Sequence, residues 1–251
     1  MGLRIIITGA NGYVGSSLYK ALKGRHNVYP LTRKDADLTR RISVNRLFRG
    51  EIYDAVIHCA GVGGSRLRQD DYSVMDENLI MYYNLFANRH SFGRFINIGS
   101  GAEIHARHTP YGLSKWVIRN SCLQNGFYNV RVFGVFDENE LDTRFIKSTI
   151  LKAKKGEPPE INGNRLFDFI YMPDFVKIIE HYLEAMPQQE VDAVYESKMS
   201  LSYIASFISD KEPVISVNHS PNYIGEYTDL GLEYIGLREG IKRVYETECI
   251  L

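Results

Sequence analysis

Short runs of consecutive apolar residues alternate along this chain with stretches in which apolar residues recur every three or four positions. The runs predict buried strands, and the stretches with helical spacing predict amphipathic helices. The predicted strands are residues 3–8, 27–32, 54–61, 94–98, 129–135, 165–171 and 194–197. The predicted helices are residues 16–23, 43–48, 74–88, 145–155, 173–186 and 238–246, with others that begin after 109–110 and near 200–202. Such alternation predicts an α/β fold with a doubly wound parallel sheet.

A glycine-rich turn follows the first predicted strand. Residues 8–15 read TGANGYVG, a GxxGxxG spacing that runs directly into a predicted helix. In this context Gly9 permits a tight turn, Gly12 lets a pyrophosphate approach the backbone, and Gly15 lets the helix pack close to the strand. The turn therefore predicts a Rossmann-type dinucleotide site, and the alternative is a glycine-rich loop without a binding role.

The second predicted strand ends in cations. Its last residues lead into Thr32, Arg33 and Lys34, and no acid appears until Asp35. An acid at this place suits the ribose 2′-hydroxyl of NAD, whereas an arginine suits the 2′-phosphate of NADP. The cations favour NADP(H), and the alternative is a solvated basic pair.

Tyr111 and Lys115 lie four positions apart in a predicted helix, and so on one face of it. A nearby ammonium favours the phenolate, so a tyrosine in this pairing can pass a proton to or from a carbonyl. Ser100 lies at the end of the fourth predicted strand, where its hydroxyl could bond a substrate carbonyl. The alternatives are a solvated helix face for the pair and an ordinary turn serine.

These candidates share one edge of the predicted sheet. The glycine turn, Arg33, Ala60 with Gly61, and Ser100 each follow a predicted strand. Ligands of open α/β sheets bind at the carboxyl ends of the strands. The sequence therefore predicts one site that holds a dinucleotide beside Tyr111.

Composition excludes several classes of partner. Among the 251 residues, 30 basic and 30 acidic side chains cancel, so no charge excess points to nucleic acid or an anionic membrane. Three cysteines, Cys59, Cys122 and Cys249, lack the spacing of metal ligands or of a disulfide framework, and no further ligands accompany His105 and His108. We expect no metal. Without a signal peptide or an apolar stretch long enough to span a bilayer, we expect a cytoplasmic protein.

Together the motifs resemble the extended short-chain dehydrogenase/reductase family, in particular its NAD(P)-dependent nucleotide-sugar epimerase/dehydratase/reductase branch. The resemblance covers nearly the whole chain. It rests on residues 8–15, residues 54–61, Asn78, Tyr111 with Lys115, and residues 131–135, 167–174 and 231–241. Residues 31–38 look most like those of NADP-dependent reductases of 4-keto-deoxysugar nucleotides.

The resemblance implies a cofactor site. Its implied residues are Gly9, Asn11, Gly12, Tyr13, Val14, Gly15, Arg33, Asp37, Leu38, Cys59, Ala60, Gly61, Lys115, Phe133 and Val135. By that implication residues 9–15 surround the pyrophosphate and Arg33 meets the 2′-phosphate. Asp37 and Leu38 meet the adenine, residues 59–61 run beside the ribose, and residues 133–135 approach the nicotinamide. NADP(H) is the expected cofactor, with NAD(H) as the alternative.

The resemblance also implies catalytic and substrate residues. Tyr111, Lys115 and Ser100 are the implied catalytic residues, and Arg165 is a candidate for the substrate diphosphate. The chain departs from the family at Gly101, where a catalytic serine or threonine usually stands. Ser100 takes that role after a local shift, or the role is vacant. Residues 102–103 offer one carboxylate instead of the dehydratases' acidic pair, which weakens a dehydratase reading.

The resulting hypothesis is an NADPH-dependent reductase of a 4-keto (deoxy)sugar nucleotide. The alternatives are an NAD-dependent nucleotide-sugar 4-epimerase and a non-catalytic dinucleotide-binding member of the family. We expect a dinucleotide-binding domain over residues 1–136, to which residues 165–186 return, and a mainly substrate-binding lobe over residues 137–251. A homodimer could form through the helices around Asn78 and Lys115, with Trp116 and Tyr83 as contacts.

Overall fold

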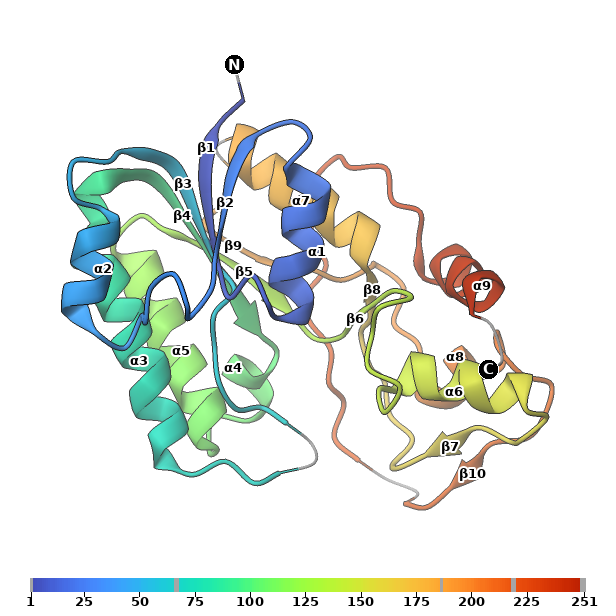
Figure 1. Ribbon diagram of the computed structural model, residues 1–251. Helices are drawn as coiled ribbons and strands as arrows, with labels where there is room; N and C mark the ends of the chain where they lie inside the picture. The colour runs from blue at the N-terminus through green and yellow to red at the C-terminus, as the bar shows by residue number, and fades with distance from the viewer. Residues whose placement is uncertain (1, 66–67, 186, 218–219, 249–251) are drawn as a thin grey trace. The chain divides into compact units, whose positions relative to one another are not determined.

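The main feature of the molecule is a six-stranded sheet in the order β2-β1-β3-β4-β5-β9 (Figure 1). The computed structural model describes residues 2–65, 68–185, 187–217 and 220–248. The strands are β1 (Arg4–Thr8), β2 (Asn27–Leu31), β3 (Tyr53–His58), β4 (Phe92–Ser100), β5 (Tyr128–Val132) and β9 (Glu190–Asp192). Parallel pairing joins β1 to β2 and to β3, and β3 to β4. The predicted α/β fold with a mostly parallel sheet is confirmed.

Helices cover both faces of this sheet. They are α1 (Tyr13–Leu22), α2 (Arg41–Leu47), α3 (Tyr72–Phe86), the short α4 (Ala102–His105) and α5 (Pro110–Gln124), with a 3₁₀ turn at Arg89–Ser91. In Figure 1, α2, α3 and α5 lie on one side of the sheet and α1 on the other. Buried Tyr82 and Leu85 of α3 and Ile118 of α5 pack with Phe95 of β4 in one apolar core. Burial of these faces removes apolar surface from water, which is the main force that holds the helices to the sheet.

Contacts divide the chain into two compact units. The first unit is Met1–Arg131 with Ile179–Val191, and the second is Val132–Ile178 with Asp192–Leu251. The second unit contains α6 (Phe145–Lys154), α8 (Leu201–Ala205), α9 (Leu237–Thr247) and the strand pairs β6 (Val135–Phe136) with β8 (Ile170–Tyr171) and β7 (Glu160–Ile161) with β10 (Val214–Ile215). The boundary at residue 178 falls inside α7 (Met172–Glu184). Residues 165–178, which we expected to return to the first domain, belong to the second unit.

Three predicted strands differ in the structure. The predicted strand 129–135 divides into β5 and β6, because β5 pairs in the six-stranded sheet whereas β6 pairs with β8. Of the predicted strand 165–171, only Ile170–Tyr171 pairs as a strand, because Phe167 and Asp168 bond the carbonyls of two separate loops instead. The predicted strand 194–197 is irregular, and the strand lies earlier, at Glu190–Asp192.

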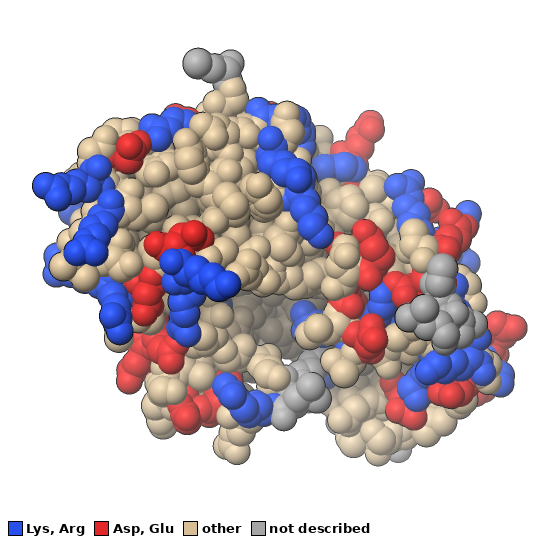
Figure 2. Space-filling view, viewed as in Figure 1, with Lys and Arg blue, Asp and Glu red and all other residues tan. Residues whose placement is uncertain are grey.

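Surface charge agrees with the zero net charge of the sequence. Figure 2 shows acidic and basic side chains interspersed over the face in view. Cys59 and Cys122 are free thiols, whereas Cys249 lies outside the described residues. No helix in the described part of the chain combines the length and hydropathy needed to cross a membrane.

Candidate functional site

The turn between β1 and α1 brings three glycines close together. Gly9 has a φ of +65°, and the N–H of Gly12 donates to its carbonyl at 2.9 Å. A Cβ on Gly15 would lie 2.4 Å from the same carbonyl oxygen, so only glycine lets α1 start this close to the strand. Gly12 caps α1 without a side-chain acceptor, which leaves N–H groups of the first turn to meet an anion. The turn thus has the form of a phosphate cradle.

The end of β3 is bonded to the end of β1. The Thr8 hydroxyl lies 2.9 Å from Nδ1 of His58 and accepts from the N–H of Ala60 at 3.2 Å. His58 is 1% exposed, and burial lowers its pKa from 6.5 to about 3, with a smaller effect from the Lys115 ammonium. Burial also raises the pKa of the Cys59 thiol to about 12. Both side chains are therefore uncharged structural groups near neutral pH.

We expect His58 to make stability depend on pH. Because its pKa is lower in the folded state than the ordinary 6.5, the unfolded chain binds more protons between about pH 6.5 and about pH 3. The free energy of unfolding should fall as pH drops through this window, by up to about 1.4 kcal/mol per unit. Denaturant unfolding at pH 7 and pH 5 measures this slope. His58→Asn should flatten it, whereas His90→Asn, at an exposed position, should not; equal slopes in both variants would refute the assignment.

In the loop after β2, the basic side chains are exposed and the carboxylates accept hydrogen bonds within the loop. Arg33 keeps 69% of its side chain exposed and lies 3.5 Å from Glu77. The Asp35 carboxylate accepts from the hydroxyl of Thr32 at 2.7 Å, and this bond lowers its pKa. Asp37 receives the same kind of bond from the Thr39 hydroxyl, also at 2.7 Å, with the same effect on its pKa. The loop therefore leaves the Arg33 guanidinium exposed, while both acids accept hydrogen bonds. The adjoining Leu38 is 6% exposed and belongs to the core.

The first turns of α5 hold the tyrosine and lysine. Thr109 caps the helix by accepting from the N–H of Gly112 at 3.0 Å, and Pro110 occupies the first turn. The Lys115 ammonium lies 5.8 Å from the centroid of the Tyr111 ring, donates to the carbonyl of Ile98 on β4 at 3.0 Å and is buried. The predicted pairing on one helix face is present, with the ammonium at the end of the sheet.

Asn78 of α3 fixes the loop that follows β3. Its amide donates to the carbonyl of Val62 at 3.0 Å and to the Ser114 hydroxyl at 3.1 Å, and its oxygen accepts from the N–H of Val62 at 2.9 Å. A Cβ on Gly61 would lie 3.8 Å from Nζ of Lys115. Loop, lysine and both helices are therefore tied at one place.

Ser100 ends β4 in a turn that leads into α4. Its N–H donates to the Glu103 carboxylate at 2.8 Å, and its hydroxyl oxygen accepts from the N–H of Ala102 at 3.2 Å. The short helix packs on the start of α5, where a Cβ on Gly112 would lie 2.0 Å from the carbonyl oxygen of Ala106. The glycine that follows Tyr111 therefore lets the Ser100 turn and the tyrosine helix approach closely.

The second unit contains three of the predicted site residues. Phe133 is 8% exposed, with its ring 5.4 Å from that of Tyr223. Val135 is buried in β6, where it pairs with Ile170. The Nε of Arg165 is buried and has no hydrogen-bond partner among the described residues. An unsatisfied guanidinium N–H away from water favours an anion beside it.

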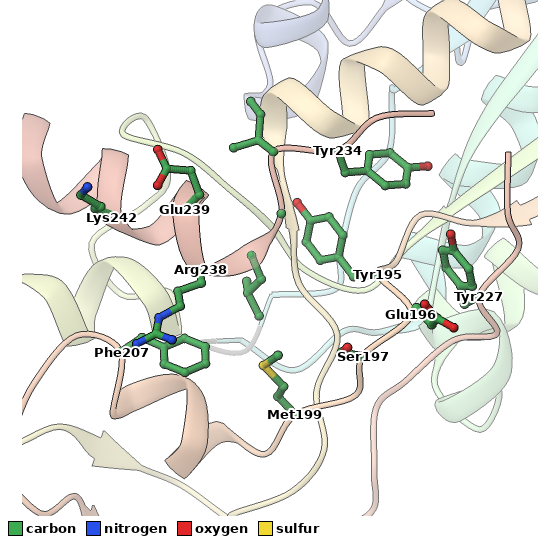
Figure 3. Close-up of a pocket in the computed structure, with 13 residues that line it drawn as sticks. Tyr195, Glu196, Ser197, Met199, Phe207, Tyr227, Tyr234, Arg238, Glu239 and Lys242 are labelled. Carbon is green, nitrogen blue, oxygen red and sulfur yellow. The ribbon is translucent and has the colours of Figure 1, made fainter. Parts of the chain in front are cut away.

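A cavity of about 760 Å³ also lies in the second unit (Figure 3). It is lined by Tyr195, Tyr227, Tyr234, Phe207, Met199 and the start of α9, and none of the predicted site residues lines it. Two of its charged groups already have partners. The Arg238 guanidinium lies 5.0 Å above the Phe207 ring, and Glu239 pairs with Arg243 at 2.9 Å. We assign no ligand to this cavity.

Comparison with known proteins identifies the family. The model of the NAD dependent epimerase/dehydratase family matches residues 5–196. The chain belongs to this family. CDP-abequose synthase of Yersinia pseudotuberculosis is 24% identical over 245 residues, which cover 86% of this chain and 84% of that protein.

Solved structures share the fold across the whole chain. UDP-glucose 4-epimerase of Thermotoga maritima matches with a TM-score of 0.82 and 18% identity, over 96% of this chain and 97% of that one. The NADP complex of dTDP-4-dehydrorhamnose reductase from Bacillus anthracis also matches with a TM-score of 0.82 and 19% identity, over 99% of this chain and 100% of that one. The predicted family resemblance and the Rossmann-type fold are confirmed, and so is the prediction of an NAD(P)-dependent enzyme.

Membership of the NAD dependent epimerase/dehydratase family agrees with the geometry of the glycine turn. A Cβ at Gly9 or Gly15 would collide with the backbone, so the turn keeps its tight form only with glycine at these positions, and this form fits a dinucleotide. No cluster of three or more histidine, cysteine or acidic side chains suited to a metal occurs in the residues that the structure describes.

Sequence reasoning missed the role of Glu103. We considered it only as half of a dehydratase's acidic pair, whereas it is 1% exposed and bonded to the Ser100 turn. A signal was present in the sequence. Arg131 stands inside the apolar run of β5, and a cation in a buried strand requires a buried acid.

Proposed function

We propose that this protein is an NADPH-dependent reductase of a 4-keto (deoxy)sugar nucleotide. The observation that carries the proposal is the placement of Lys115. Lys115 is 6% exposed, and its ammonium donates to the carbonyl of Ile98 at 3.0 Å and lies 5.8 Å from the centroid of the Tyr111 ring. Burying a lysine ammonium costs desolvation free energy unless the ammonium is paired and hydrogen-bonded. A buried ammonium beside a phenol is suited to proton transfer at a carbonyl.

The proposed reaction divides the work between cofactor and protein. When bound, the reduced nicotinamide would supply a hydride to the keto carbon of the sugar. Tyr111 donates its phenolic proton to the carbonyl oxygen, which becomes a hydroxyl, and Lys115 stabilises the phenolate that remains. Ser100 donates its hydroxyl hydrogen to the same oxygen, because its own oxygen is already bonded by Ala102.

The loop after β2 supports NADPH over NADH. Asp35 and Asp37, the acids nearest the strand end, both accept hydrogen bonds from threonine hydroxyls, which compete with a ribose hydroxyl for the same oxygens. Arg33 is exposed and pairs only loosely with Glu77. A guanidinium recognises a phosphate through charge-assisted hydrogen bonds.

Arg33→Gln should shift the choice of cofactor. We expect the Kd for NADPH to rise about 10- to 100-fold, because a charge-assisted contact with the 2′-phosphate is lost. The Kd for NADH should change less than threefold, since NADH lacks that phosphate. Titration calorimetry with both cofactors measures the two values. Arg49→Gln, which removes another exposed guanidinium of the first unit, should alter neither, and parallel losses for NADPH and NADH in Arg33→Gln would contradict the assignment.

The substrate class rests on relatives and on Arg165. The curated relative is named CDP-abequose synthase, and one of the solved structures of the same fold is a dTDP-4-dehydrorhamnose reductase. The buried, unpartnered Nε of Arg165 suits an oxygen of the diphosphate that a nucleotide sugar carries.

A turnover panel tests the proposal. Purified protein is mixed with NADPH and 4-keto-6-deoxysugar derivatives of several nucleoside diphosphates, and the fall in NADPH absorbance is followed. Consumption of NADPH with at least one of them is the expected result. Bound NAD in the purified protein, with sugar interconversion and no reductant, would support a 4-epimerase instead. Dinucleotide binding without any turnover would support a non-catalytic role.

A homodimer through α3 and α5 remains a prediction. Tyr83 of α3 is 44% exposed, and on α5 the half-buried Trp116 has the Arg107 guanidinium 5.6 Å above its ring. Sedimentation velocity distinguishes a dimer from a monomer.

A further inference from the structure

The side chain of Glu103 is a buried carboxylate that the proposed reaction does not use. It is 1% exposed and accepts hydrogen bonds from three donors. These are the N–H of Ser100 at 2.8 Å, Nδ2 of Asn129 at 3.0 Å and Nε of Arg131 at 3.0 Å. Two of the donors come from β5 and one from the turn at the end of β4, so this carboxylate joins the turn to the neighbouring strand.

The carboxylate belongs to a chain of charges in the first unit. Arg131 also pairs with Glu190 of β9, and Glu190 pairs with Arg119 of α5 at 2.5 Å. Burial raises the pKa of Glu103, and the Arg131 guanidinium opposes that rise. Buried ion pairs seldom add much stability over a well-packed apolar replacement. The ion pair of Glu103 with Arg131 therefore matters more for the geometry of the turn than for stability.

Gly99 makes room for the carboxylate. A Cβ at this position would lie 2.3 Å from Oε1 of Glu103 and 2.9 Å from the amide of Asn129. With the carboxylate seated there, the Ser100 N–H is fixed at 2.8 Å from Oε1. The hydroxyl oxygen of Ser100 then accepts from the N–H of Ala102 at 3.2 Å. A hydroxyl whose oxygen is occupied in this way still has its hydrogen to donate.

We propose that Glu103 is a positioning residue, which holds the turn so that Ser100 supplies the hydroxyl donor that Gly101 lacks. The inference rests on the proposed reductase function, in which Ser100 bonds the substrate oxygen. Glu103 itself does not touch the substrate. It acts through the backbone N–H of Ser100, and Arg131 with Asn129 keeps its carboxylate in place.

A double-mutant cycle tests this dependence. Glu103→Gln keeps the shape of the side chain, but its NH2 group must face either the Ser100 N–H or the donors of Asn129 and Arg131. A reacting group misplaced by about 1 Å can cost about 100-fold in rate, so we expect kcat to fall about 10- to 100-fold. The KM for the nucleotide sugar and the Kd for NADPH should stay within about threefold, because Glu103 acts only through the turn.

The second arm of the cycle is Ser100→Ala. It should lower kcat about 100-fold, as the loss of one donor to a developing oxyanion does. In the Ser100→Ala background, adding Glu103→Gln should lower kcat by less than about threefold, because the hydroxyl that Glu103 positions is already absent. If the two losses multiply, or if Glu103→Gln alone leaves kcat unchanged, the inference is wrong.

Arg119→Gln is the matched control. It breaks the ion pair at the outer end of the same chain of charges without touching Glu103. Its kcat should stay within about twofold of wild type, because neither Ser100 nor Glu103 loses a hydrogen bond. A fall in kcat as large as that of Glu103→Gln would show a general structural effect and overturn the inference.

Amide hydrogen exchange separates this inference from the proposed function. In Glu103→Gln, exchange should speed up in peptides that cover residues 98–106, and in Arg119→Gln it should not. Unchanged exchange in Glu103→Gln overturns the positioning role whatever the reaction is. A different outcome is faster exchange in Glu103→Gln although the wild type turns over none of the sugar nucleotides in the panel. That result would contradict the proposed reaction but would still show that Glu103 stabilises the turn.

Discussion

Tyr111→Phe should lower kcat by about 1,000-fold while the protein remains folded and still binds NADPH, since a general acid contributes about 100- to 10,000-fold. The substitution removes one oxygen, and the ring can keep its place above the Lys115 ammonium, 5.8 Å from the centroid. The ammonium also keeps its bond to the carbonyl of Ile98. The loss should therefore appear in kcat, measured with a 4-keto sugar nucleotide under saturating NADPH.

Tyr72→Phe is the matched control for that experiment. Tyr72 lies at the start of α3 and is 74% exposed, so loss of its hydroxyl should change kcat less than twofold. A Tyr111→Phe enzyme within a few-fold of wild type would exclude this phenol as the proton donor. A proportional fall in NADPH affinity would instead assign the hydroxyl to cofactor binding.

Local sequence was sufficient to predict the parts of the site that depend on one element. Four positions of separation place Tyr111 and Lys115 on one helix face in any α-helix. The glycines at positions 9 and 15 mark a turn with no room for a Cβ there, and the structure has Gly9 at a positive φ. The parallel order of the strands follows from their alternation with helices. These features require no knowledge of distant contacts.

The parts that escaped prediction depend on distant contacts. Lys115 is anchored by a carbonyl of β4, which lies 17 residues earlier in the chain. The fifth predicted strand divides because β6 pairs with β8, a distant segment that no local pattern reveals. The Glu103 carboxylate is paired with the guanidinium of Arg131, 28 residues later. Charged residues placed in or beside apolar strands were the only local sign of that network, and a single sequence does not say which acid meets which base.

The second large effect is expected at the glycine turn. Gly9→Ala should weaken NADPH binding at least tenfold and lower the free energy of unfolding by about 2–5 kcal/mol. The added Cβ would lie 2.7 Å from Cα of Ala60 and 2.7 Å from N of the same residue, and the φ of +65° costs an alanine about 1–2 kcal/mol. Relief of the clash must move the backbone, because both contacts are backbone atoms, and overpacking of this kind costs about 1–3 kcal/mol. Denaturant unfolding and NADPH titration of the folded variant measure the two losses.

A series of three glycine-to-alanine variants distinguishes an effect specific to the β1–α1 turn from the general effect of replacing a glycine. Gly24→Ala should leave NADPH affinity unchanged and stability within about 1 kcal/mol, because no atom lies within 4 Å of its Cβ position. Gly12→Ala should be intermediate, since its Cβ would lie 3.2 Å from the carbonyl oxygen of Gly9, where a small shift relieves the contact. The order Gly9, Gly12, Gly24 in loss of NADPH affinity follows from the close approach of the β1–α1 turn to the end of β3. Equal affinities across the series would mean that the dinucleotide phosphates do not bind at this turn.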